Sequence, residues 1–142
     1  MEIQKIGVIG AGQMGNGIAH VLAIAGYNVL LNDISQEALD KGLDTVRKNM
    51  ERQVSREKMT QTEMDDALAL ISPTLILTDL GQTDLVIEAA TEKEAVKTAI
   101  FQELVPHLQE HTILTSNTSS ISITRLASGT DRPERFMGFH FM

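Results

Sequence analysis

Three glycines near the N-terminus have the spacing of a turn that binds a diphosphate. Gly10, Gly12 and Gly15 follow an apolar segment, 5–9, and precede a helical pattern over 14–25. In such a strand-to-helix turn the first glycine permits a tight turn, the second lets a diphosphate approach the backbone, and the third lets helix and strand pack closely. The helix N-terminus directs unpaired N–H groups at the same spot. The spacing therefore predicts a dinucleotide site.

An acidic residue at the end of the next apolar segment indicates which dinucleotide is bound. Residues 27–33 have the pattern of a second strand, and Asp33 lies 23 residues after Gly10. A carboxylate at that place accepts hydrogen bonds from both ribose hydroxyls and repels a 2′-phosphate. The alternative is a glycine turn near an unrelated acid, which the strand–helix–strand context disfavours. We therefore predict NAD as the cofactor, and not NADP.

Polar residues also follow three later segments that have the pattern of strands. They are the segments 88–92 and 116–120 and the single residue His140. Ligands bind beyond the carboxyl ends of strands in a parallel sheet, so these residues are predicted to form one cluster. Two alternatives stay open: the segment 116–120 is an ordinary polar turn, or His140 is a packed residue. For His20, His107 and His111 a surface or capping role is favoured over catalysis.

Basic residues recur along the helix that is predicted to begin after Ser35, a good N-cap residue. Lys48, Arg52 and Arg56 stand four residues apart and so share one face of that helix. Charged runs on helices are usually solvated faces. On spacing alone, this face is either such a surface or a site for the phosphate groups of a ligand.

The elements that position these residues alternate between strand and helix. Strands are predicted over 5–9, 27–33, 71–74, 85–88, 112–116 and 135–142, and further helices over 94–104 and 122–127. Thr60 or Thr62 is expected to cap a short helix that pairs with the long one, and Pro73 favours either an edge position or an early end for its strand. The pattern predicts an α/β fold, a right-handed, doubly wound, mostly parallel sheet with a helical pair inserted after the second strand.

Composition narrows the class of protein further. The chain has 142 residues, for which we predict one domain over 1–142. A net charge of −7 disfavours nucleic acid as a partner. There are no cysteines, so disulfides and thiolate metal sites are excluded, and no metal is expected. Neither a signal pattern nor a membrane-spanning apolar segment is present in the sequence, so we expect no membrane contact and a cytoplasmic location.

Four segments in order closely resemble the NAD-binding domain of L-3-hydroxyacyl-CoA dehydrogenases, especially bacterial 3-hydroxybutyryl-CoA dehydrogenases. They are Val-Ile-Gly-Ala-Gly-Gln-Met-Gly (8–15), Leu-Val-Ile-Glu-Ala-Ala (85–90), Ser-Asn-Thr-Ser-Ser-Ile-Ser-Ile (116–123) and Arg-Phe-Met-Gly-Phe-His-Phe (135–141). The resemblance covers the whole chain, and four motifs are far more specific than the glycine motif alone. It implies a Rossmann domain that serves the NAD-dependent oxidation of an L-3-hydroxyacyl-CoA to the 3-ketoacyl-CoA, in fatty acid or butanoate metabolism.

The resemblance also implies roles for individual residues. His140 becomes the catalytic base, since imidazole can take the hydroxyl proton near neutral pH as the neighbouring carbon gives up hydride. Ser119 lies beside cofactor and substrate and holds the reacting oxygen. The implied cofactor contacts are Gly10, Ala11, Gly12, Gln13, Met14, Gly15, Asp33, Glu92, Lys97, Asn117 and Ser119. The implied coenzyme A contacts are Asn49, Arg56 and Ser119, to which the shared helix face adds Arg52.

The sequence departs from the family pattern at its end. Family members continue past the histidine into Asn-Pro-Val and a helical domain, whereas this chain ends at Met142. That domain supplies the glutamate that orients the histidine and most of the contact of a homodimer. We therefore expect a truncated cofactor-binding half with little or no turnover of its own. Two alternatives remain, a non-catalytic NAD-binding module and a related β-hydroxyacid dehydrogenase with a non-CoA substrate.

Overall fold

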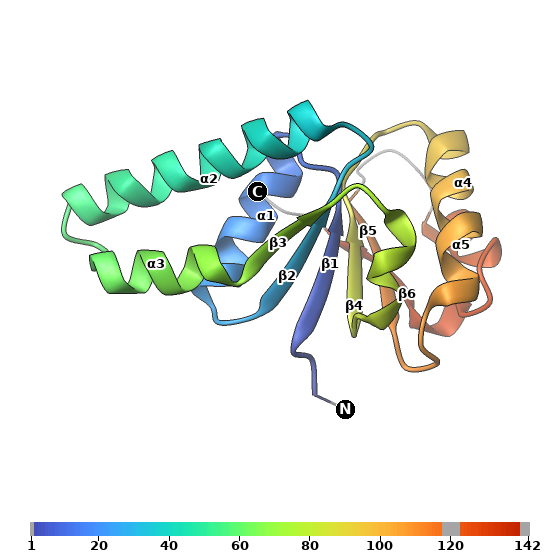
Figure 1. Ribbon diagram of the computed structural model, residues 1–142. Coiled ribbons are helices and arrows are strands. Elements are labelled where there is room, and N and C mark those ends of the chain that lie inside the picture. The colour runs from blue at the N-terminus through green and yellow to red at the C-terminus, as the bar shows by residue number, and fades with distance from the viewer. Residues whose placement is uncertain (1, 118–122, 140–142) are drawn as a thin grey trace.

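The computed structural model of the protein describes residues 2–117 and 123–139, and a six-stranded sheet runs through its centre (Figure 1). The strands are β1 Lys5–Ile9, β2 Asn28–Asn32, β3 Ile71–Thr74, β4 Leu85–Glu88, β5 Ile113–Asn117 and β6 Phe136–Phe139. They stand in the order β3-β2-β1-β4-β5-β6, and every neighbouring pair is parallel. The predicted doubly wound α/β fold is confirmed.

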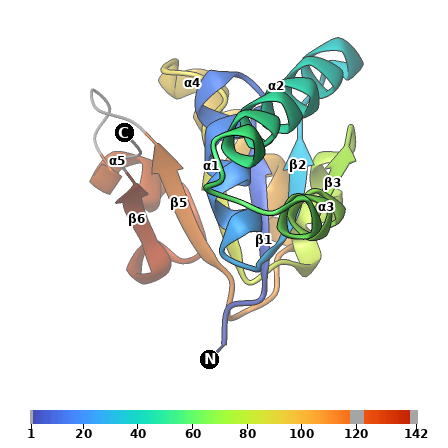
Figure 2. The ribbon, with the colours of Figure 1, turned by 90° about the vertical axis from the view of Figure 1, so that its left-hand side faces the viewer.

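Helices cover both faces of this sheet (Figures 1 and 2). The α-helices are α1 Gln13–Ile24, α2 Gln36–Ser55, α3 Gln61–Ala69, α4 Glu94–Leu104 and α5 Ile123–Ser128. Three 3-10 helices, η1 Leu77–Gln82, η2 Val105–His107 and η3 Pro133–Arg135, lie in the connections. None of the helices in residues 2–117 and 123–139 is long and apolar enough to cross a membrane.

Two hydrophobic cores result, because successive side chains of a strand point to opposite faces of the sheet. Ile6 and Val8 of β1 pack with Val46 and Met50 of α2 in the first core. On the other face Ile9 belongs to a second core, whose other members include Leu80, Val86, Phe101, Leu114 and Phe136. The rings of Phe101 and Phe136 meet edge to face there, with centroids 5.2 Å apart. Both cores pack against the central strands. Because these strands are parallel, their carboxyl ends lie together at one end of the sheet.

Local capping signals agree with the structure. The Ser35 hydroxyl accepts a hydrogen bond from the backbone N–H of Ala38 at the start of α2. Thr60, and not Thr62, caps α3, because Thr60 and Glu63 form a reciprocal capping box. Pro73 lies in β3, which is an edge strand as predicted.

Several details differ from the sequence-based expectation. The bounds of β2, α1 and α5 differ by one residue from the predicted 27–33, 14–25 and 122–127. The fifth strand is Ile113–Asn117 and so begins and ends one residue later than the predicted 112–116. The 3-10 helix η1 was not predicted; it places the buried side chain of Leu80 against Gly7 of β1, where a Cβ would lie 2.7 Å from the Leu80 side chain. Of the predicted strand 135–142, residues 136–139 form β6, and His140 to Met142 lie outside the described residues.

Candidate functional site

The carboxyl ends of β1, β2 and β4 enclose a pocket of about 560 Å³. It lies where the strand order reverses, because the chain leaves β1 for β2 on one side and returns to β4 on the other. Clefts at such a switch point are the usual ligand sites of open parallel sheets. Gly10 and Asp33 line this pocket together with Ala90, Thr91 and residues of η1 and α4.

The three glycines of the turn differ in their surroundings. Gly10 has a φ of +102°, and a Cβ there would lie 2.8 Å from the carbonyl oxygen of Ala89. A Cβ on Gly15 would lie 1.6 Å from the carbonyl oxygen of Gly10, so α1 and the turn are in direct backbone contact. At Gly12 a Cβ would meet nothing within 4 Å. The turn is therefore tightly packed at its two ends and open at its middle.

The side chain of Asp33 is bonded to this turn. Its Oδ2 accepts a hydrogen bond from the backbone N–H of Ala11 at 2.9 Å, and its Oδ1 accepts one from the backbone N–H of Ser35 at 3.0 Å. A carboxylate offers about four acceptor positions. Each oxygen of Asp33 thus keeps acceptor capacity toward the pocket that it lines.

Large apolar side chains are exposed beside Asp33, a feature that sequence reasoning missed. Ile34 is 95% exposed and Ile76 is 59% exposed, and both line the pocket with Leu75 and Val96. Apolar walls with a few polar groups are typical of sites for flat organic ligands. Only the place of Ile34, directly after Asp33, could have indicated this in the sequence; Ile76 and Val96 reach the pocket through tertiary packing.

A buried ionic cluster lies near the carboxyl ends of β4 and β5, between these strands and α4. The side chains of Glu88 and Lys97 have no exposed area, and the ammonium of Lys97 donates to Glu88 Oε1. The same oxygen accepts a hydrogen bond from the Ser116 hydroxyl at 2.7 Å, while Oε2 accepts one from the backbone N–H of Ala90 at 2.8 Å. Lys97, a predicted cofactor contact, therefore directs its charge into the protein and toward Glu88.

The other predicted cofactor residues that the structure describes follow or end strands at the same carboxyl end of the sheet. Gln13 and Met14 are exposed in the first turn of α1, Glu92 is exposed between β4 and α4, and Asn117 is half-buried at the end of β5. Ser119 and His140 lie outside the described residues.

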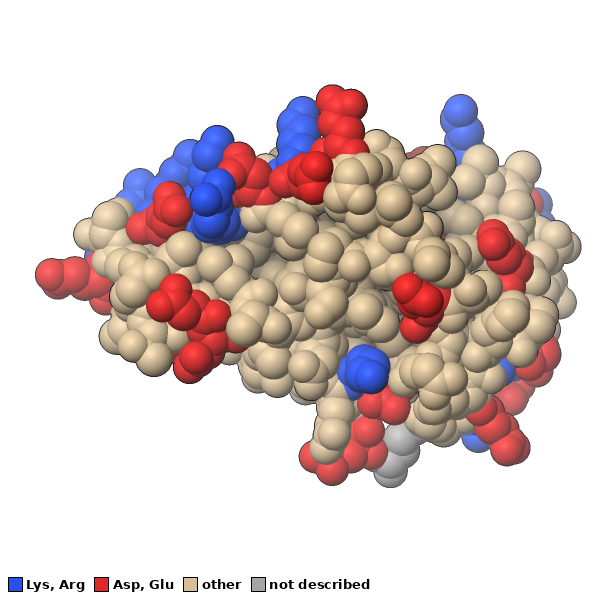
Figure 3. Space-filling view, in the orientation of Figure 1, with Lys and Arg blue, Asp and Glu red and all other residues tan. Residues whose placement is uncertain are grey.

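The basic residues of α2 form a separate surface. Arg52 and Arg56 are exposed, and Arg52 donates a hydrogen bond of 3.3 Å to the side-chain oxygen of Asn49. Lys48 and Arg47 both pair with Asp44. Figure 3 shows the cluster of Lys and Arg side chains over the far part of α2. Since α2 begins at the pocket and rises about 1.5 Å per residue, Arg52 lies roughly 25 Å along the helix from it. The structure does not bring this surface into the pocket.

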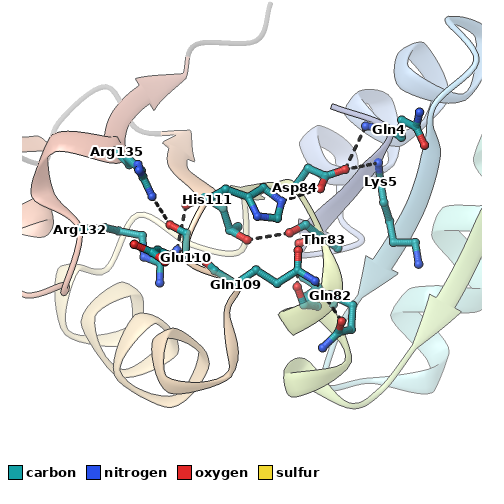
Figure 4. A network of polar contacts seen from close by, with 12 residues as sticks. Gln4, Lys5, Gln82, Thr83, Asp84, Gln109, Glu110, His111, Arg132 and Arg135 are labelled. Carbon is teal, nitrogen blue, oxygen red and sulfur yellow. Dashed lines mark hydrogen bonds and ion pairs between the residues drawn. The ribbon is translucent and has the colours of Figure 1, made fainter. Parts of the chain in front are cut away.

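The described histidines have structural partners away from the pocket or are exposed. His20 Nε2 lies 3.0 Å from the side-chain oxygen of Gln53, and His107 is exposed. His111 Nε2 contacts Asp84 at a distance of 2.8 Å, near the amino ends of β4 and β5 and so at the end of the sheet away from the pocket (Figure 4). That contact, with the backbone N–H groups of Gln4 and Lys5, lowers the pKa of Asp84 to about 2. Residues 2–117 and 123–139 contain no group of side chains that could hold a metal ion.

Comparison with known proteins identifies the family of the chain. Residues 5–142 match the family described as "3-hydroxyacyl-CoA dehydrogenase, NAD binding domain". A 3-hydroxybutyryl-CoA dehydrogenase of Bradyrhizobium diazoefficiens is 56% identical over 99% of this chain and 48% of its own length. The crystal structure of (S)-3-hydroxybutyryl-CoA dehydrogenase from Ralstonia eutropha superimposes with a TM-score of 0.96 at 45% identity, over 99% of this chain and 50% of that one. The chain thus spans about half the length of these relatives.

Proposed function

The chain belongs to the family of NAD-binding domains of 3-hydroxyacyl-CoA dehydrogenases, and we propose that it holds NAD for the oxidation of an L-3-hydroxyacyl-CoA to the 3-ketoacyl-CoA. The observation that carries this proposal is the pocket in which Asp33 is bonded to the glycine turn. The relatives named 3-hydroxybutyryl-CoA dehydrogenase favour a short acyl chain.

The residues of the pocket fit NAD. The open space at Gly12 admits a diphosphate against the N-terminus of α1, whose free N–H groups bind anions. Ile34 and Ile76 provide an apolar wall for an adenine, and Asp33 retains acceptor positions for ribose hydroxyls. The negative charge of Asp33 opposes the 2′-phosphate of NADP. When bound, NAD supplies the acceptor for the hydride.

We assign the proton transfer to His140 and the binding of the reacting oxygen to Ser119. Support comes from the family resemblance and from the position of β6. Phe139 is paired with Asn117 at the carboxyl end of β5, and His140 is the next residue along the chain. The imidazole takes the proton of the substrate hydroxyl, which must leave as the carbon gives up hydride.

The exposed basic face of α2 is the proposed site for the phosphate groups of coenzyme A. Arg52 and Arg56 are exposed, and Asn49 accepts a hydrogen bond from Arg52. Guanidinium groups bind phosphate oxygens in a bidentate manner, which suits this role. On the strength of the family resemblance we further propose that the enzyme acts as a homodimer in the cytoplasm.

The test is acetoacetyl-CoA-dependent oxidation of NADH, followed by loss of NADH absorbance. It is measured with the chain alone and with a polypeptide that adds the C-terminal half present in its relatives. We expect turnover in the longer polypeptide, none with acetoacetate, and little or none in the chain alone. NADH binding without turnover at either length would favour the non-catalytic module, and turnover with acetoacetate would favour the non-CoA substrate.

A further inference from the structure

The pair of Glu88 and Lys97 is unusual because neither side chain has exposed area. Removing two charges from water is costly, and a pair of apolar residues often gives equal or greater stability. Stability alone therefore does not account for an ion pair at this place. The location of the pair suggests a role in the pocket instead. Glu88 is the last residue of β4, at the end of the sheet where the pocket lies.

One oxygen of Glu88 is hydrogen-bonded to the backbone that forms the wall of that pocket. Oε2 accepts a hydrogen bond from the backbone N–H of Ala90, which fixes the turn that follows β4. This turn touches the glycine turn, because the Cβ position of Gly10 lies 2.8 Å from both the Ala89 carbonyl oxygen and the Ala90 Cα. A shift of the turn after β4 would therefore move either the pocket wall or the glycine turn itself.

The other oxygen of Glu88 acts on the neighbouring strand. Oε1 accepts a hydrogen bond from the hydroxyl of Ser116, which is fully buried and directly precedes Asn117 at the end of β5. Ser116 and Glu88 are also cross-strand neighbours in the register of β4 and β5. One carboxylate thus joins the ends of two strands, and it accepts hydrogen bonds from three donors. Lys97 is the third donor, and its ammonium forms a fully buried ion pair with Glu88.

We propose that Glu88 is a positioning residue for the dinucleotide and that Lys97 supports it as its buried counter-charge. The inference rests on the proposed binding of NAD. It gives Lys97 a part in holding the binding backbone in place. It also gives Glu88 and Ser116, which belong to the segments 88–92 and 116–120 predicted to cluster at the strand ends, a specific role there.

Two double variants separate positioning from stability. Glu88→Met/Lys97→Met replaces the pair by apolar side chains of similar length, so the buried charge is removed but Ala90 and Ser116 lose their acceptor. Glu88→Gln/Lys97→Met also removes both charges, but its amide still accepts from Ala90 and donates to the Ser116 hydroxyl. Asp84→Asn is the matched control. Asp84 directly precedes β4 and so lies at the opposite end of that strand from Glu88, where it bonds Gln4, Lys5 and His111.

The measurements are the melting temperature and the dissociation constant for NADH, determined by calorimetry on the same samples. We expect the Met/Met variant to bind NADH about tenfold more weakly than wild type, since small misplacements of binding groups have large effects. The Gln/Met variant should recover to within about threefold. Asp84→Asn should melt at a lower temperature and keep its NADH affinity within about twofold, as expected for a change remote from the site.

Three results contradict or decide the inference. Wild-type affinity in the Met/Met variant would overturn it, as would equal affinities in the two double variants. If the Met/Met variant does not fold, Ser116→Ala decides: an affinity lower by about threefold supports the inference and an unchanged affinity overturns it. Failure of the wild-type protein to bind NADH would instead refute the proposed function.

Discussion

Asp33 and Ala11 are joined by a hydrogen bond of 2.9 Å, from the backbone N–H of Ala11 to Oδ2 of Asp33. The acid at the end of β2 is therefore part of the glycine turn and does not merely face it. The carboxylate is held at one place in the pocket, and the same group that we propose to select the cofactor also holds the turn.

This relationship predicts a double effect of replacing Asp33. In Asp33→Ala, NADH affinity should fall about tenfold or more, the amount expected for lost hydrogen bonds to a charged group. NADPH binding should not fall in proportion, since the repulsion of the 2′-phosphate is also removed. Calorimetry with both cofactors measures the ratio. Asp33→Asn is the control, because its amide can keep one bond to the turn; an unchanged cofactor preference in both variants would refute the assignment of Asp33.

Gly12→Ala and Gly15→Ala should separate cofactor binding from folding. A Cβ at Gly12 meets nothing within 4 Å, so the stability of the protein without ligand should change by less than about 1 kcal/mol, while NADH affinity falls about tenfold or more. A Cβ at Gly15 would lie 1.6 Å from the Gly10 carbonyl, so this variant should lose roughly 3 kcal/mol or more of stability. Denaturant unfolding and calorimetry on both variants give the comparison. Equal destabilisation by the two would contradict the described turn.

Much of the fold could be predicted because its signals are local. Thr60 and Glu63 form the capping box that their spacing indicates, and the strand 85–88 and the helix 94–104 were predicted at their observed bounds. The features that were missed depend on tertiary packing. Leu80 is buried against Gly7, where a Cβ would lie 2.7 Å from its side chain.

In the candidate site, too, the features with local sequence signals could be predicted, and those that depend on tertiary packing could not. The spacing of the glycines and Asp33 indicates a common site, and the structure brings Gly10 and Asp33 to one pocket. The burial of Lys97 could not be predicted, because the residue is charged and its burial depends on how α4 packs over β4. A charged residue on a helix is ordinarily exposed.

Asp84 should make stability depend on acid pH. Its folded-state pKa, lowered to about 2 chiefly by the His111 contact and by two backbone N–H groups, lies below the ordinary value of 3.8. Its contribution is therefore complete above about pH 4 and is lost as the pH falls through about 2. Asp84→Asn should cost on the order of 1 to 2 kcal/mol near neutral pH, and the difference from wild type should shrink in acid.

Denaturant unfolding of wild type and Asp84→Asn across this pH range measures that difference. Asp66→Asn is the control, because Asp66 is exposed on α3 and should leave the pH profile unchanged. A difference that stays constant down to about pH 2 would show that Asp84 acts through packing and not through its charge.

Charge reversal on α2 should affect coenzyme A and spare NADH. Arg56→Glu, in the polypeptide that includes the C-terminal half, should raise KM for acetoacetyl-CoA severalfold because it replaces an attraction to phosphate by a repulsion. The defect should shrink at high ionic strength, where salt screens exposed charges. Lys41→Glu makes the same change nearer the start of α2. Equal defects in both variants would indicate an effect of net charge and not a local phosphate site.

Direct calorimetric titration of residues 1–142 with NADH and with NADPH tests the central claim. The pocket at Gly10 and Asp33 predicts one NADH site per chain and an affinity for NADPH at least about tenfold weaker, since the charge of Asp33 opposes the extra phosphate. Absence of NADH binding, or equal affinities for the two cofactors, would contradict the account.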